Sequence, residues 1–161
     1  MGLFNNVFGG NSEKKLAIAK SKDWANYIQS IEAQVNEVFN SIDTVLKMYP
    51  LGSALLNKEM LEKVWQNISY QEHQVFMLRS MNEQMQKDGR VITSFARAND
   101  YRLEKVQLNM IRKVEQFNIV AEEKVSDWPV MREKISKEMK STVKAQLYRT
   151  WGLTYPGPFW N

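Results

Sequence analysis

The sequence contains no cysteine, only 4 prolines and 7 glycines among its 161 residues, and a single histidine. The absence of cysteine excludes disulfides, thiol catalysis and cysteine-ligated zinc. The one histidine, His73, lies in a helical pattern beside Glu72 and has no companion residue for a metal site. We interpret it as a solvated helical residue rather than a ligand or a base. The sequence therefore predicts no catalytic residue, no metal and no cofactor.

Long apolar runs are also absent, since no stretch approaches the roughly 18 residues that a membrane-spanning helix needs. The apolar N-terminus lacks the basic region and the cleavage pattern of a secretory signal. Gly9-Gly10 lacks the lysine and the preceding strand of a phosphate-binding loop. Hydrophobic residues nevertheless make up 43% of the chain, which is enough to bury a core. We expect one domain built from long, uninterrupted helices.

The clearest pattern is a heptad seam between Trp24 and Tyr49, where apolar residues alternate at spacings of four and three. Its members are Trp24, Ile28, Ile31, Val35, Val38, Ile42 and Val45. Phe39 and Leu46 widen the apolar face, and a wide face indicates contact with more than one helix. Ile and Val at both core positions favour three or more strands over two in parallel assemblies. We predict that this seam joins the subunits of a homo-oligomer.

The predicted fold is all-α, either a long-helix bundle or elongated helical hairpins with heptad seams that oligomerisation completes. No strand pattern of useful length is present. Turn signals at Pro50-Leu51-Gly52, Asp88-Gly89 and Trp128-Pro129 separate the helices. The helical domain spans 13–150, with helices expected at about 13–49, 54–88, 90–125 and 129–150. In the second helix Gln71 and Asn82 interrupt the seam, and polar seam residues commonly fix register or partner number.

Residues 1–12 form an apolar N-terminal tip that we expect to be flexible, because Gly9-Gly10 follows its apolar residues. Those residues share one face of a short helix and are Leu3, Phe4, Val7 and Phe8. One interpretation is a membrane-seeking anchor, helped by lysines just behind it. The other is a tip that docks on its own bundle or on a neighbouring subunit. Either way, these residues are candidate membrane or partner contacts.

Residues 151–161 form an extended C-terminal tail, since Pro156 and Pro158 forbid a helix. Its aromatic anchors are Tyr155, Phe159 and Trp160. An extended aromatic tail can pack on its own bundle or insert into the groove of a partner. We favour docking to a partner or to a neighbouring subunit, because exposed aromatic rings are unfavourable in water.

The last predicted helix is basic. Between Pro129 and Thr150 six basic residues face two acidic ones, a difference that equals the net charge of +4 of the whole chain. The candidate phosphate contacts are Arg132, Lys134, Lys137, Lys140 and Lys144. They indicate either a sequence-independent contact with nucleic acid or lipid headgroups, or an ordinary solvated helix face. No base-reading motif accompanies them.

In layout the chain resembles the internal virion or DNA-ejection proteins of short-tailed phages. The resemblance lies in the apolar, glycine-containing N-terminus MGLFNNVFGG, in helices rich in Gln and Met such as MLRSMNEQMQ at 77–86, and in the basic C-terminal helix. It implies subunits that assemble into rings or tubes and meet a bacterial envelope and packaged DNA. It transfers no functional residue, and the aromatic tail departs from the family layout.

Three functions follow as hypotheses. The first is a non-enzymatic structural protein, a virion component that homo-oligomerises through helical seams and meets membrane or other structural proteins through its termini. The second is a basic helical protein that binds nucleic acid, and the third is a membrane-active amphipathic protein. The expected location is the virion, or otherwise the cytoplasm or a membrane surface.

Overall fold

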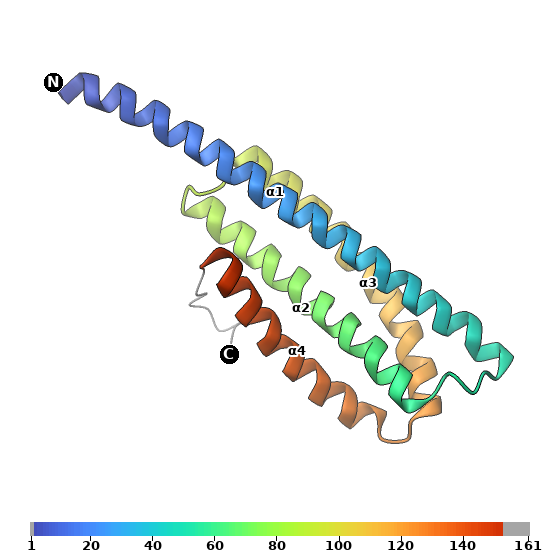
Figure 1. Ribbon diagram of the computed structural model, residues 1–161. Helices are drawn as coiled ribbons and strands as arrows, with labels where there is room; N and C mark the ends of the chain where they lie inside the picture. Colours follow the sequence, from blue (N-terminus) through green and yellow to red (C-terminus); the bar gives the residue numbers. More distant parts are fainter. Residues whose placement is uncertain (1, 153–161) are drawn as a thin grey trace.

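The computed structural model describes the backbone of residues 2–152 and the side chains of residues 18–152. Within this part of the chain it contains α-helices and a short 3-10 helix but no strand, in agreement with the predicted all-α class. The elements are α1 (Gly2–Met48), η1 (Tyr49–Leu51), α2 (Lys58–Lys87), α3 (Thr93–Lys124) and α4 (Trp128–Trp151). Successive helices run in opposite directions, so the chain forms an up-and-down bundle (Figure 1).

The turns between the helices follow the residues that were expected to form them. Gly52, after Pro50, and Gly89, after Asp88, adopt φ of 63° and 71°, which glycine accepts without strain. Helix α2 begins at Lys58, a few residues later than predicted, because Asn57 caps it. The Asn57 side-chain oxygen accepts a hydrogen bond of 2.9 Å from the backbone N–H of Met60.

Helix α1 differs from the prediction at its N-terminal end. Its backbone is helical from Gly2 onward and passes through Gly9-Gly10, whereas a flexible tip and a helix beginning at about residue 13 were expected. The first turns of α1 extend beyond the other helices of the bundle (Figure 1). The side chains of Leu3, Phe4, Val7 and Phe8 lie outside the described residues.

The apolar seam of α1 lies inside the chain's own core, which corrects its assignment as a seam between subunits. Its seven side chains, from Trp24 to Val45, are 0–6% exposed. Helix α1 packs against α2 and α3, and the seam residues fall into the two core clusters that these helices share. A heptad pattern reports an apolar face but not which helix covers it. Here helices of the same chain cover it.

Polar seam residues of α2 hold neighbouring helices through hydrogen bonds that are buried or partly buried. The side chain of Asn82 accepts a bond of 3.0 Å from Trp24 Nε1 of α1 and donates one of 2.8 Å to the Ala96 carbonyl of α3. Gln71 donates a bond of 3.0 Å to the Gln34 side chain of α1. Their specific partners agree with the predicted role of such residues in setting register.

Helix α2 is the central helix of the bundle. It packs against α1, α3 and α4, whereas α3 and α4 meet each other only briefly. The Trp65 indole of α2 donates a hydrogen bond of 3.0 Å to the Arg132 carbonyl, which fixes the first half of α4 on α2. At the other end of α4, Trp151 lies edge-on to Trp24, with ring centroids 4.9 Å apart. One side of α2 is therefore left open between α3 and α4.

Candidate functional site: a groove on α2 between α3 and α4

A groove follows the open side of α2. It consists of three cavities of about 580, 360 and 610 Å³. The first and second cavities share the lining residues Phe76 and Gln107, and the second and third share Glu72 and Ser136. Because neighbouring cavities share walls, they form one continuous depression. Its floor is α2, and for most of its length α3 and α4 are its sides.

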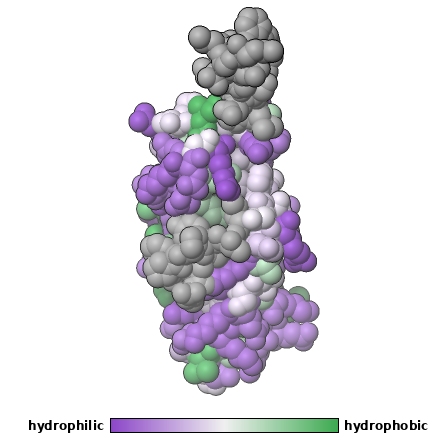
Figure 2. Space-filling model, turned by 90° about the vertical axis from the view of Figure 1, so that its left-hand side faces the viewer, coloured by the Kyte–Doolittle hydropathy of each residue, from purple (hydrophilic) through white to green (hydrophobic). Residues whose placement is uncertain are grey.

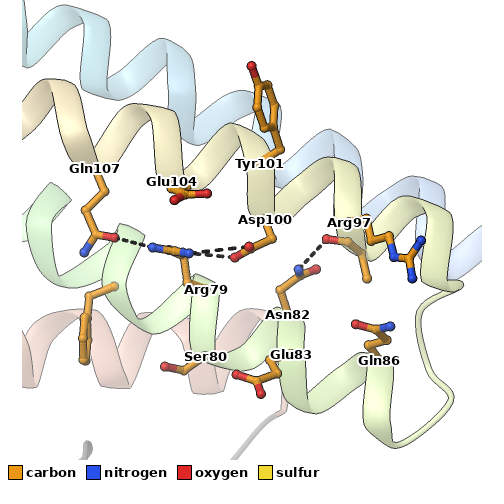
Figure 3. A pocket seen from close by; sticks show the side chains of 12 residues that line it. Arg79, Ser80, Asn82, Glu83, Gln86, Arg97, Asp100, Tyr101, Glu104 and Gln107 are labelled. Carbon is orange, nitrogen blue, oxygen red and sulfur yellow. Dashed lines mark hydrogen bonds and ion pairs between the residues drawn. The ribbon is translucent and has the colours of Figure 1, made fainter.

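Ion pairing ties α2 to α3 at the first cavity (Figure 3). The Arg79 guanidinium donates a hydrogen bond of 3.0 Å from Nε to Asp100 and one of 2.8 Å from Nη1 to the side chain of Gln107. Such a forked contact fixes the guanidinium plane. Tyr101, in contrast, points away from α2 in this view. This end of the groove is therefore polar, and Arg79, Asp100 and Gln107 are already bonded to one another.

A polar cluster occupies the second cavity, between α2 and α4. His73 Nε2 lies 2.9 Å from Ser136 Oγ, within hydrogen-bonding distance. Burial lowers the pKa of His73, a hydrogen bond with the Ser136 backbone opposes that shift, and the charge of Lys140 adds to it. A neutral His73 accepts or donates in the bond to Ser136 Oγ according to its tautomer. His73, expected from the sequence to be solvated, is instead half-buried between two helices.

Glu72 contributes to both the second and third cavities. Burial raises the pKa of its carboxyl group from 4.5 to about 7, and the positive charge of Arg132 opposes that rise only in part. A carboxyl group with such a pKa changes its charge near neutral pH. Glu72 therefore makes the charge of the groove depend on pH near neutrality.

The basic residues of α4 are divided by the fold. Arg132, Lys137 and Lys140 line the groove. Lys144 lies one turn beyond Lys140, and burial, together with the charge of Lys140, lowers the pKa of Lys144. Neither Lys134 nor Lys144 lines a cavity, but Lys144 is half-buried one turn beyond the cavity-lining Lys140, whereas Lys134 is exposed. We call Lys137, Lys140 and Lys144 the basic wall of the groove.

The opposite side of the groove, along α3, carries exposed apolar residues together with acidic and basic ones, among them Arg97 in the first cavity. Four large apolar side chains are exposed there by between 55 and 69%. They are Tyr101, Leu108, Ile111 and Ile119. Glu104, Glu115 and Glu122 are exposed beside them, at helical positions three or four residues from an apolar or groove-lining residue. We call these seven residues the α3 rim. Phe76 of α2 adds a further exposed ring, at 41%, on the groove floor.

The side of the molecule drawn in Figure 2 is mostly hydrophilic. Figure 2 shows one side of the molecule, on which the described hydrophobic residues form small separate areas among hydrophilic ones. In the part of the chain that the structure describes, no helix is long and apolar enough to cross a membrane. Among the same residues, no group of three or more His, Asp or Glu is placed to hold a metal ion.

The groove combines some residues that the sequence analysis named with others that it missed. The basic wall was named, while the seam of α1 lies in the core and the tail residues Tyr155, Phe159 and Trp160 lie outside the described residues. The α3 rim was missed, although its spacing is visible in the sequence as a second set of apolar positions at 101, 108, 111 and 119. The contact of His73 with Ser136 carried no sequence signal, because it joins separate helices.

The comparisons with known proteins leave the groove as the main guide to function. No family model, no curated protein and no solved structure matches this chain.

Proposed function

We propose that this protein is a non-enzymatic structural protein that acts by assembly, binding further copies of itself and partner proteins through helical surfaces. The observation that carries the proposal is the α3 rim, a row of exposed apolar side chains beside an open groove. The core of the bundle is already filled by other residues, so the fold does not need these side chains.

The energetic argument concerns the exposure of the α3 rim. Full burial of a Leu or Ile side chain contributes about 1.5–3 kcal/mol, and a rim of four large apolar residues therefore has several kcal/mol to gain from a partner. Isolated exposed apolar residues are common and need no explanation. Leu108 and Ile111, however, are neighbours on one helix face, and Ile111 lines the second cavity of the groove, as expected of a binding surface.

Size-exclusion chromatography with light scattering tests the proposal. We expect a species larger than the 18.9 kDa monomer at micromolar concentration. Ile111→Glu should shift it toward the monomer, because a charge is placed in the buried contact. Val130→Glu is the matched control, since Val130 is an exposed residue of α4 outside the three cavities of the groove. A wild-type protein that stays monomeric would contradict the proposal.

A virion component, an internal or DNA-ejection protein of a phage particle, is the more specific form of this proposal. Its support is the sequence resemblance together with a helical bundle whose first helix extends beyond the rest (Figure 1). Mass spectrometry of purified particles, with the protein tagged at an exposed position, tests it. The protein should be present in stoichiometric amounts, and its absence from the particles would reject this form.

Phosphate binding by the basic wall is a second candidate function. Lys137, Lys140 and Lys144 lie on neighbouring turns of α4, so they present several positive charges to one ligand. A filter-binding titration with duplex DNA should show an affinity that falls steeply with salt. The triple change of these lysines to Ala should remove the binding, whereas Lys134→Ala should leave most of it. Absence of binding at low salt would end this candidate.

Membrane contact through the N-terminal tip is a third candidate, favoured by the projection of α1 beyond the bundle (Figure 1). Liposomes containing anionic lipid should carry the intact chain to the top of a density gradient. Deletion of residues 2–8 should abolish flotation. Unchanged flotation after the deletion would exclude a role for Leu3, Phe4, Val7 and Phe8.

A further inference from the structure

We propose that the groove is the docking site for the N-terminal segment of α1 from a second copy of this chain. Each copy inserts residues 2–17 of its α1 into the groove of the other, so that two equivalent contacts form a closed two-fold dimer. The inference rests on the proposed assembly function and specifies its surface, its occupant and its symmetry.

The occupant is the part of α1 that extends beyond the bundle (Figure 1). The Ser21 hydroxyl accepts a hydrogen bond of 3.1 Å from the backbone N–H of Ile92, so the turn between α2 and α3 meets α1 at Ser21. Residues 2–17 precede that contact, and their backbone is helical. Gly9 and Gly10 disfavour a helix, and an unsupported helix of this length is only marginally stable in water. A partner that packs against the segment therefore stabilises its helix.

The groove is open at the same end of the bundle. Helices α3 and α4 are joined by a short turn at 125–127, which closes the groove at the third cavity, near Pro129. At the other end, the described residues that line the first cavity come from α2 and α3 alone. A helix can therefore enter along α2 from the end at which α1 extends beyond the bundle (Figure 1). A copy related by a two-fold axis across this end has its α1 pointing back into the groove.

The reach of the segment agrees with the depth of the groove. Helix α2 ends at Lys87, and the turn that follows it meets α1 at Ser21, so both residues mark this end of the bundle. From Ser21 back to Val7, α1 extends about 21 Å at the helical rise. From Lys87 back to His73 in the second cavity, α2 extends about 21 Å as well. When two copies meet end to end, Val7 of each therefore reaches the second cavity of the other.

The chemical character of the segment agrees with that of the groove. Four large apolar residues share one face of its first turns, at helical spacing. They are Leu3, Phe4, Val7 and Phe8. These residues reach the second cavity, which is lined by the exposed side chains of Ile111 and Phe76, at 55% and 41%. Residues 11–15 are polar or charged and lie at the polar first cavity. Apolar surface thus meets apolar surface, which supplies the affinity of the contact.

The expected interface has the size of a stable dimer. The segment is about 24 Å long, and the half of its surface that faces the groove covers about 400 Å². Two such contacts, each with two sides, bury about 1,600 Å² in total, which is typical of specific complexes. We therefore expect a dimer that persists at micromolar concentration.

Cross-linking between introduced cysteines tests the inference, because the chain contains no cysteine of its own. Val7→Cys lies on the segment and Ile111→Cys lies in the groove. An equimolar mixture of these two variants, treated with a short bis-maleimide, should give a covalent heterodimer. Neither variant alone should cross-link, since the two copies of each position lie about 40 Å apart in the dimer. Val7→Cys mixed with Val130→Cys is the matched control and should give no product, because Val130 is exposed on α4 outside the three cavities.

A variant with both cysteines tests the symmetry. Within one chain Val7 lies beyond the end of the bundle and Ile111 lies inside it, so no cross-link forms within a chain. A closed two-fold dimer should give covalent dimers and nothing larger, because both contacts join the same two copies. A ladder of larger species would show that each segment enters the groove of a third copy, and would overturn the two-fold arrangement.

A charge in either half of the contact should weaken the dimer. Phe8→Glu and Ile111→Glu should each raise the dissociation constant, measured by light scattering, at least tenfold, because each places a charge in both contacts. Val130→Glu is the control and should change the dissociation constant less than twofold. Circular dichroism monitors the fold of every variant.

Each outcome has a defined meaning. Cross-linking in the mixture, together with a weaker dimer in both glutamate variants, supports the inference. A wild-type oligomer that resists either substitution overturns it and leaves the proposed assembly function to another contact. A wild-type protein that is monomeric at every concentration overturns both. If Phe8→Glu abolishes flotation with liposomes and leaves the oligomer unchanged, the segment binds membrane and the dimer is overturned.

Discussion

The Trp24 indole donates a buried hydrogen bond of 3.0 Å to the Asn82 side chain, which joins the seam of α1 to α2 across 58 residues of sequence. Asn99 Nδ2 lies 3.4 Å from the same Asn82 oxygen, and the Asn82 amide donates in turn to the Ala96 carbonyl. One asparagine thus connects α1, α2 and α3. Because each of these groups is buried, a helix that shifted by one residue would leave several polar atoms without partners.

Asn82→Ala should destabilise the fold by about 2–4 kcal/mol, since it leaves the Trp24 N–H and the Ala96 carbonyl unpaired and opens a cavity. Urea unfolding followed by circular dichroism measures the loss. Asn109→Ala, at an exposed position of α3, is the control and should change stability by less than about 0.5 kcal/mol. In a double-mutant cycle with Trp24→Phe, the double variant should lose less stability than the sum of the losses of the two single variants. Full additivity would show that the hydrogen bond contributes nothing.

Ile42→Ala should destabilise the chain by about 2–5 kcal/mol, because Ile42 is fully buried in the seam of α1. The loss should be the same at low and high protein concentration, as the seam lies within one chain. Urea midpoints measured at two concentrations provide the check, and Val130→Ala, at an exposed position of α4 outside the groove, is the control. A loss of stability that becomes smaller at high protein concentration would show instead that the seam lies in an interface between subunits.

Glu72→Gln should stabilise the protein above pH 7 and change it little near pH 4.5. In the folded protein the pKa of Glu72 is raised from 4.5 to about 7, so the folded state binds more protons than the unfolded state between these values. Stability from this group therefore decreases as pH rises through that window, by about 1–3 kcal/mol in all. Glutamine keeps the size of the side chain and removes the charge.

The free energy of unfolding of Glu72→Gln and of the wild type, measured at pH 5 and at pH 8, tests this prediction. His73, whose pKa is lowered, has the opposite effect, since its contribution increases as pH rises toward 6.5. Arg132, Lys140 and Ser136 surround the pair in both proteins, so the difference between variant and wild type isolates Glu72. Glu123→Gln, at an exposed position, should show no such difference. Equal stability of Glu72→Gln and wild type at pH 8 would mean that Glu72 is well solvated.

Gly89→Ala should destabilise the protein by about 1 kcal/mol, because Gly89 adopts φ of 71° in the turn between α2 and α3. A Cβ atom at this position would meet nothing within 4 Å, so backbone strain is the only penalty. Gly89→Asn should lose less, since asparagine tolerates this conformation better. Urea unfolding of the two variants gives the comparison, and equal stability of Gly89→Ala and wild type would show that the turn relaxes.

The helical fold was predictable because its determinants are local. Pro50 and Gly52 end α1, Gly89 closes the next turn, and Pro129 lies in the first turn of α4. These residues act through their own backbone conformation, which does not depend on the rest of the chain. Start positions were less accurate. At Asn57 the cap, rather than the end of the preceding loop, decides where α2 begins.

The groove was predictable only in part. The basic residues of α4 were identified from composition and spacing, and the apolar positions of the α3 rim follow a spacing that the same reasoning could have found. The perturbed carboxyl group of Glu72 and the contact of His73 with Ser136 depend on which helices lie beside α2. Sequence spacing relates residues on one helix but says nothing about neighbours from other helices.

The sequence by itself therefore determined the helices, their turns and the apolar face of α1, because helical periodicity and the backbone preferences of glycine and proline are properties of short segments. Only the tertiary structure decided what covers each face. The Trp24 seam is buried by α2 and α3 of the same chain, while the row from Tyr101 to Ile119 stays exposed beside the groove. Both patterns are apolar stripes on a helix. One is buried and the other exposed because the hydrophobic effect is non-directional, so the packing of the helices decides which stripe is covered.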